Sequence, residues 1–271
     1  YYTGKEEQVK ERLGVFLNDL KPSDPDIKEN ESVELWGILE VKSKSEEPFL
    51  IEIKCNSSNV TGTHSISQFS VEGNNDIDID CIFKDGFKKG NHKINMVATY
   101  NFETAAYLKI HFINEERKET MKRAGLDIFE EFGITEKNPV SRYTSGPIKI
   151  GMATSLQPIG IDQEAITKPK IGFTIENTWE GKIKNITALK IKIPKGLELD
   201  KDTCDYSFTR IETGELTTTY QINEEIGEIK KYRSFNCRTK ITNQNALLGN
   251  IPLSTKELSV SAEYIFELEE Q

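Results

Sequence analysis

The chain has 271 residues, a formal net charge of −9 and 29% charged residues, and its length suits two ordinary domains or one large one. Its basic residues are scattered through an acidic background, which disfavours phosphate-backbone binding, so no nucleic-acid partner is expected. No apolar run approaches the ~20 residues that span a bilayer, so a membrane attachment would need an anchor outside this sequence.

The first half of the chain predicts short β-strands. Apolar and polar residues alternate with period two in six segments, and turn residues such as those at 73–75 and 86–90 separate them. The predicted strands span residues 33–41, 49–55, 66–71, 77–83, 93–102 and 106–113. Regularly spaced short strands favour an all-β sandwich over alternating strands and helices.

Four Asn-x-Ser/Thr sequons are candidate N-glycosylation sites, which occur on the surfaces of secreted proteins. They begin at Asn30, Asn56, Asn59 and Asn185. Some sequons arise by chance in a chain with this much Asn, Ser and Thr. Asn56 and Asn59 follow the end of a predicted strand, where a glycan could be accommodated.

Three carboxylates in the predicted strand near residue 78 are the best metal candidate. Asp76, Asp78 and Asp80 alternate along one strand face and could offer hard oxygen ligands to calcium. Cys81 stands where an EF-hand loop would place glycine, and the intervening isoleucines favour a half-buried strand with a solvated acidic face. No other cofactor is expected.

The hydrophobic period changes after residue 114. Residues 115–132 are highly charged and fit one or two short helices around Gly125, whereas residues 135–145, with Pro139, are typical of a loop. We therefore predict a helical and loop connection at 115–142 between two domains, 1–114 and 143–271.

The second half returns to alternating strands. They are predicted at 148–152, 170–177, 186–193, 206–211, 216–222, 232–241 and 258–268. The run 146–151 contains two glycines, but Pro147 and the alternation favour an ordinary turn and edge strand. This half therefore predicts a second β-sandwich.

One strand pattern occurs in both halves. Residues 94–102 and 258–266 match at alternate positions and share an Ala-x-Tyr-x-Phe core, which favours tandem related domains. A further strand follows Phe102, whereas none has room to follow Phe266. The second domain would then take a missing strand from its own 141–161 region, which we favour, or from another molecule.

The four cysteines share parity with the apolar side of their predicted strands, so each should point into a core. Two inward cysteines in each half predict one disulfide per domain, pairing Cys55 with Cys81 and Cys204 with Cys237. Disulfides of this kind suit an oxidising compartment. The alternative is four buried free thiols.

No catalytic residue is predicted. The three histidines His64, His92 and His111 match no zinc-binding spacing, and His111 shares parity with Lys109, so it should be exposed. The chain has no nucleophile elbow, phosphate-binding loop or Cys-x-x-Cys pair. Paired Asp and Glu residues, as in glycosidases, assemble in space and leave no such motif.

The two tryptophans bear on glycan binding, which uses exposed aromatic rings as stacking platforms. Trp36 lies within a predicted strand, where core packing is the expected outcome. Trp179 follows a strand and precedes Gly181, at a turn where it could be exposed, so its environment stays open. Trp179 is therefore the better candidate for a glycan platform.

Parts of the second half resemble the Ig-like repeats of archaeal cell-surface and S-layer-associated proteins. The resemblance rests on residues 172–178, on the strand and Pro-x-Gly turn of 191–197 and on residues 264–267, within 167–199 and 256–268. It covers less than half of the chain, and the first half departs from it. The resemblance implies a sandwich fold and a surface location, and names no partner.

The combined expectation is a non-enzymatic extracellular, cell-surface protein with a structural or adhesive role. It would form part of a filament, lattice or envelope assembly, with copies of itself or other surface proteins as partners. The alternative is a module that binds a glycan or a protein. A glycosidase-type enzyme is the third interpretation.

Overall fold

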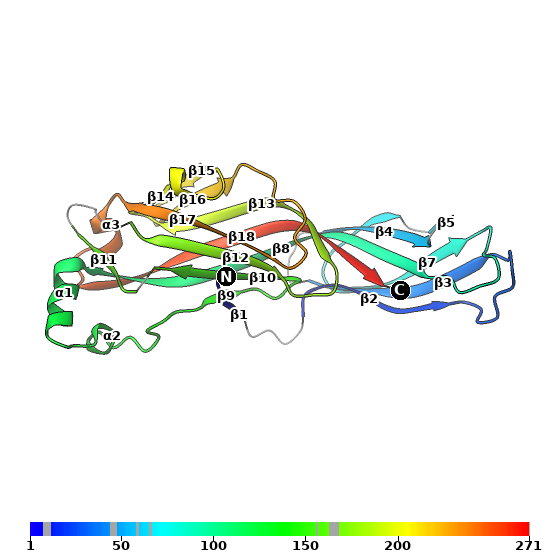
Figure 1. Ribbon diagram of the computed structural model, residues 1–271, viewed down its shortest axis with the longest axis horizontal. Coiled ribbons are helices and arrows are strands. Elements are labelled where there is room, and N and C mark those ends of the chain that lie inside the picture. The colour runs from blue at the N-terminus through cyan, green and yellow to red at the C-terminus, as the bar shows by residue number, and fades with distance from the viewer. Residues whose placement is uncertain are drawn as a thin grey trace.

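The alternating segments form β-strands in both halves, and the computed structural model of the chain is all-β with few helices (Figure 1). The structure describes residues 1–7, 12–43, 48–57, 60–64, 67–155, 157–162 and 168–270. Two sandwich-like lobes follow one another along the long axis. The N-terminus lies in one lobe and the C-terminus in the other (Figure 1).

The first lobe, on the right in Figure 1, packs two sheets against each other. One sheet has the order β2-β3-β7, with antiparallel neighbours. Its strands are β2 (Gly14–Pro22), β3 (Val33–Lys42) and β7 (Asn75–Phe83). The facing sheet contains β4 (Phe49–Ser57), β5 (Val60–Thr61), β6 (Gln68–Val71) and the first part of β8 (Ile94–Asn114).

The second lobe is also built from two facing sheets. The smaller has the order β10-β12-β17-β14, and the larger continues the sheet of the first lobe in the order β1-β9-β8-β18-β13-β16-β15. The smaller sheet consists of β10 (Ile148–Thr154), β12 (Lys170–Asn177), β17 (Tyr232–Ile241) and β14 (Leu197–Asp200). The larger adds β1 (Gly4–Glu6), β9 (Ser141–Tyr143), β18 (Leu253–Glu270), β13 (Lys182–Pro194), β16 (Thr217–Ile222) and β15 (Phe208–Thr213). The second lobe also contains three short elements: β11 (Ile159–Ile161), the 3-10 helix η1 (Lys201–Thr203) and α3 (Gln244–Leu248).

Two long strands run through both lobes. β18 pairs antiparallel with β8 along its whole length, from Leu253 beside Ile113 to Glu270 beside Met96. The strands predicted separately at 93–102 and 106–113 are thus one strand. One continuous hydrophobic core extends through both lobes.

The matching segments 94–102 and 258–266 belong to these two paired strands and meet at their last three residues, where 100–102 pair with 264–266. Tyr100 is paired with Phe266, and Phe102 with Tyr264. Their shared Ala-x-Tyr-x-Phe pattern thus belongs to two neighbouring strands of one sheet that face the same core. The aromatic side chains of the two strands therefore form cross-strand pairs in that core.

Strand pairing crosses the domain boundaries suggested by the sequence. β1 comes first in the chain but pairs with β9 in the second lobe, while the end of β18 pairs with β8 in the first lobe. Independent folding of 1–114 and 143–271 stays a prediction. If each unit folded alone, β8 and β18 would lose the hydrogen bonds that they make to each other along their whole paired length.

Two helices form where the change of period predicted them. α1 (Glu115–Arg123) and α2 (Ile128–Glu131) begin at the side-chain caps Asn114 and Asp127, and Gly125 takes the positive φ of 70° that follows the end of α1. Their place differs from the prediction. Both helices lie at the far left end of the second lobe and cap it, so they do not connect the lobes (Figure 1). Within the described residues, no helix is long and apolar enough to cross a membrane.

Candidate functional site

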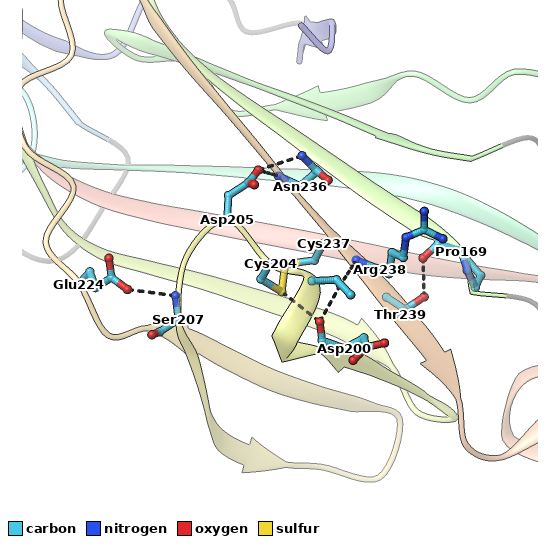
Figure 2. Close-up of a disulfide and its surroundings, with 11 residues drawn as sticks. Pro169, Asp200, Cys204, Asp205, Ser207, Glu224, Asn236, Cys237, Arg238 and Thr239 are labelled. Carbon is cyan, nitrogen blue, oxygen red and sulfur yellow. Dashed lines mark hydrogen bonds between the residues drawn. A yellow bond between two sulfur atoms is a disulfide. The ribbon is translucent and has the colours of Figure 1, made fainter.

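Each lobe contains one disulfide. Cys55 of β4 is bonded to Cys81 of β7, which links the two sheets of the first lobe, and Cys204 after η1 is bonded to Cys237 of β17 (Figure 2). These are the two pairs that strand parity suggested. Three of the four sulfur-bearing residues are fully buried, and Cys204 is half-buried.

Hydrogen bonds hold the segment around Cys204 against β17 (Figure 2). The Asp205 carboxylate accepts hydrogen bonds from the backbone N and the Nδ2 of Asn236, both at 2.8 Å. The backbone N of Arg238 donates to Thr203 Oγ1 at 2.9 Å. The disulfide and these hydrogen bonds together attach residues 203–205 to β17, which is a structural role.

Asp200, at the end of β14, is a buried carboxylate between two lysines. Lys240 Nζ lies 2.7 Å and Lys168 Nζ 3.4 Å from its oxygens. The hydrogen bond from Lys240 holds the pKa of Asp200 below its usual range. The lysines occupy the sides of this carboxylate, so it acts as an ion-pairing group.

The acidic strand predicted for calcium is β7. Asp76 and Asp78 are exposed, and they alternate with Ile77 and the buried Ile79. The carboxylates, with Asp80, are spread along one strand face. Within the described part of the chain, no group of three His, Cys, Asp or Glu side chains converges as a metal site. The fold thus does not gather these three carboxylates into one cluster, and calcium binding there stays a prediction.

The sequons differ in accessibility. Asn30, at a turn with a φ of 61°, and Asn56, in β4, are exposed. Asn185 is half-buried in β13, and its Nδ2, the atom that would carry a glycan, donates a hydrogen bond to Glu225. Asn59 lies outside the described residues. Asn30 and Asn56 are therefore the better glycan acceptors.

His111 is buried, which corrects the prediction from parity. Its side chain is 3% exposed; its Nδ1 lies 2.9 Å from Thr255 Oγ1 and its ring packs edge-on against Phe129 of α2. The helical cap covers the outer face of β8 here, so both faces of the strand are enclosed. Burial lowers the pKa of His111.

This burial predicts a pH dependence. The unfolded chain protonates His111 as the pH falls through ~6.5, whereas the lowered pKa in the folded chain delays protonation to lower pH, so stability should fall on acidification below ~6.5. Replacement by His111→Asn should weaken this loss. Urea unfolding at pH 8 and pH 5.5 measures it, and parallel pH profiles for the two proteins would contradict the assignment.

The structure corrects the expectation for Trp36 and decides the open case of Trp179. Trp36 projects from the outer face of β3, 36% exposed, with Lys21 Nζ 4.2 Å from the centre of its ring. Trp179 is half-buried between the lobes, against Phe16 at 4.9 Å and Phe266 at 6.3 Å between ring centres. Trp179 therefore closes the waist between the lobes and does not form an exposed glycan platform.

Two clefts among the described residues have volumes near 800 Å³, within the usual range of ligand sites. The distal cleft, about 800 Å³, lies at the end of the first lobe between residues 27–33 and 87–94 and includes Lys28, Lys88 and Lys89. The waist cleft, about 820 Å³, lies between the lobes. It combines the ring of Phe102 with the polar side chains of Asn101, Glu103 and Thr187 and with the ion pair between Lys190 and Glu263.

The second lobe also contains an occupied site that sequence analysis missed, which we call the N-terminal slot. It is formed by Ser141, Tyr143, Gly151, Gly172 and Thr174, and it holds residues 1–7. β1 pairs parallel with β9, and the backbone N of residue 7 donates to the Tyr143 carbonyl at 2.8 Å. The segment thereby forms the outer strand of the larger sheet.

Tyr2 packs directly against the backbone of two glycines, Gly151 and Gly172. A Cβ on Gly172 would stand 1.9 Å from Tyr2 Cζ, and one on Gly151 would stand 1.9 Å from the Tyr2 carbonyl oxygen. The Tyr2 backbone N donates to Thr174 Oγ1 at 2.8 Å. Both glycines are therefore required by the close approach of the N-terminal segment.

Tyr1 extends the contact over the outer face of the smaller sheet. Its hydroxyl donates to Glu176, which raises the pKa of Tyr1, and its ring packs edge-on against Tyr232 at 5.4 Å. The signal that could have revealed the slot was glycine inside two predicted strands, since interior glycines often mark a close approach of another backbone.

Comparison with known proteins adds little to this geometry. No family model matches the sequence, and no curated protein matches it. Among solved structures, a chain described as "Biofilm associated protein - B domain" aligns with 97% of this chain and 75% of its own length, at 10% identity and a TM-score of 0.17. A TM-score this low carries no argument about fold or function.

Proposed function

We propose that this chain is a non-enzymatic structural or adhesive protein of the cell surface, built to take part in an extracellular assembly. The observation that supports this best is the continuous ladder of β8 and β18 through two lobes, each with its own disulfide. Such a chain forms an elongated, cross-linked unit. Disulfides of this kind persist in oxidising compartments.

The accessible sequons support the same location. Asn30 and Asn56 expose their side chains in the first lobe, where a glycan would meet no packed neighbour. The alternative function is a ligand-binding module, and the waist cleft would be its binding site. The ring of Phe102 and the polar groups around it resemble the mixture that sugars bind.

The experiment is immunogold electron microscopy of intact source cells, with native mass spectrometry of the purified protein. We expect label at the cell surface, both disulfides in peptides mapped without reduction, and ordered polymers or defined oligomers. An intracellular protein with free thiols would contradict the proposal. A surface monomer that binds a glycan saturably would favour the ligand-binding module instead.

A further inference from the structure

We infer that the N-terminal slot accepts residues 1–7 of a second copy of this chain, so that copies assemble by exchanging this strand. The inference rests on the proposed assembly role and names its contact. We choose residues 1–7 of a second copy as the occupant because the same seven residues fill the slot within one chain.

The first step is that residues 1–7 are held by the second lobe, although the chain continues directly into β2 of the first. The hydroxyl oxygen of Ser141 lies 3.2 Å from both the Thr3 and the Ile150 carbonyl oxygens and shares its one proton between them, so it bridges the segment to β10. Tyr2 and Tyr1 add the contacts with β12 and β17 described above. The segment is thus an insert into a lobe that lies elsewhere in the sequence.

The second step is that none of these contacts depends on the two partners belonging to one chain. A second copy presents the same backbone groups and the same tyrosines, so the hydrogen bonds and packing would be identical. The exchanged and unexchanged forms therefore differ in free energy only through the conformation of residues 8–13 and through any new contacts between copies. Exchange of an identical element is therefore a low-cost route to association.

The third step concerns reach. Six residues, 8–13, separate the inserted segment from Gly14, which is fixed at the waist because a Cβ there would lie 2.6 Å from Trp179. Six extended residues span ~20 Å. The waist of the donating copy must then lie within about that distance of the accepting slot, which requires neighbouring copies to overlap side by side.

The fourth step concerns concentration. A short connection gives the segment an effective concentration in the mM range for its own slot. In dilute solution each chain should therefore fill its own slot. A second copy competes once copies are crowded to a similar level, as they are inside a polymer or a lattice, or once further contacts form between them.

The experiment uses two variants with one new cysteine each. Lys5 and Arg142 are exposed partners in the parallel pair of β1 and β9. Chains carrying Lys5→Cys are mixed with chains carrying Arg142→Cys, unfolded in guanidinium chloride without reductant, refolded together at high concentration and oxidised. We expect a covalent dimer in which peptide mapping finds a 5–142 link, which no single chain in this mixture can form internally.

Three controls make the result decisive. The double variant Lys5→Cys/Arg142→Cys should close internally in dilute solution, which shows that the pair is in bonding geometry. Glu212→Cys, on the distant strand β15, should give no link to position 5. Adding Gly172→Leu to the Arg142→Cys chain should abolish the dimer, because the new side chain fills the space of Tyr2.

Two outcomes would overturn the inference. One is a double variant that does not close, since the segment would then not occupy the slot. The other is a double variant that closes while the mixed single variants give no 5–142 peptide at any concentration. If the protein still forms polymers on cells, the proposed function stands and only the strand exchange is lost.

Discussion

Replacing Phe266 by alanine should lower the free energy of unfolding by ~3–5 kcal/mol, the range for a large aromatic residue in a packed core. The Phe266 side chain is fully buried, and its ring lies 5.8 Å from Tyr100 and 6.3 Å from Trp179 between centres. It lies in the ladder shared by both lobes. We therefore expect both lobes to lose stability together.

Urea denaturation followed by circular dichroism gives the magnitude, and hydrogen exchange read by mass spectrometry resolves the two lobes. A matched control is Leu50→Ala, which changes an exposed side chain of β4 and should cost under ~0.5 kcal/mol. If one lobe alone were destabilised, in a separate transition, the predicted independent domains 1–114 and 143–271 would be supported.

Replacing both Cys204 and Cys237 by alanine should destabilise the protein by ~3–4 kcal/mol in the chain-entropy account of disulfides. The bond closes a loop with a sequence separation of 33 residues, and the Cys55–Cys81 bond closes one of 26. Loop length enters only logarithmically, so the equivalent double replacement in the first lobe should cost about the same, ~3–4 kcal/mol.

Denaturant midpoints of the two double variants, compared with the unreduced protein, test this expectation. Reduction of the unaltered protein should reproduce the combined loss. Unchanged stability after complete reduction would show that hydrogen bonds such as those from Asn236 to Asp205 hold the corner without the disulfide.

Local patterns predicted the secondary structure well because they depend on residues close in sequence. Alternation with period two marks a strand with one buried face, and it placed β3, β4, β7 and β12 close to their observed bounds. The charged segment after residue 114 is helical, and Asn114 and Asp127 cap the two helices there. Parity also oriented Cys55, Cys81 and Cys237 correctly, whereas Cys204 follows η1 outside any strand and is half-buried.

The same parity argument failed where a third element covers a strand. His111 occupies the side of β8 that alternation assigns to solvent, but α2 packs over it with Phe129. The turn containing Trp179 left its burial open, and only the fold shows that it packs against Phe16 between the lobes. In both cases the covering residue belongs to another element, 18 residues from His111 and 163 from Trp179, so the alternation within one strand does not report it.

By itself, the sequence determined that this protein is all-β, where most strands lie and which cysteines could pair, since strand parity and turn residues are local properties. Only the tertiary structure decided that β8 and β18 join the two lobes, that the matching strands are neighbours, and that residues 1–7 fill a slot between Gly151 and Gly172. These features depend on which surfaces meet. Contacts between segments more than a hundred residues apart follow from the packing of the whole core, which period and propensity do not encode.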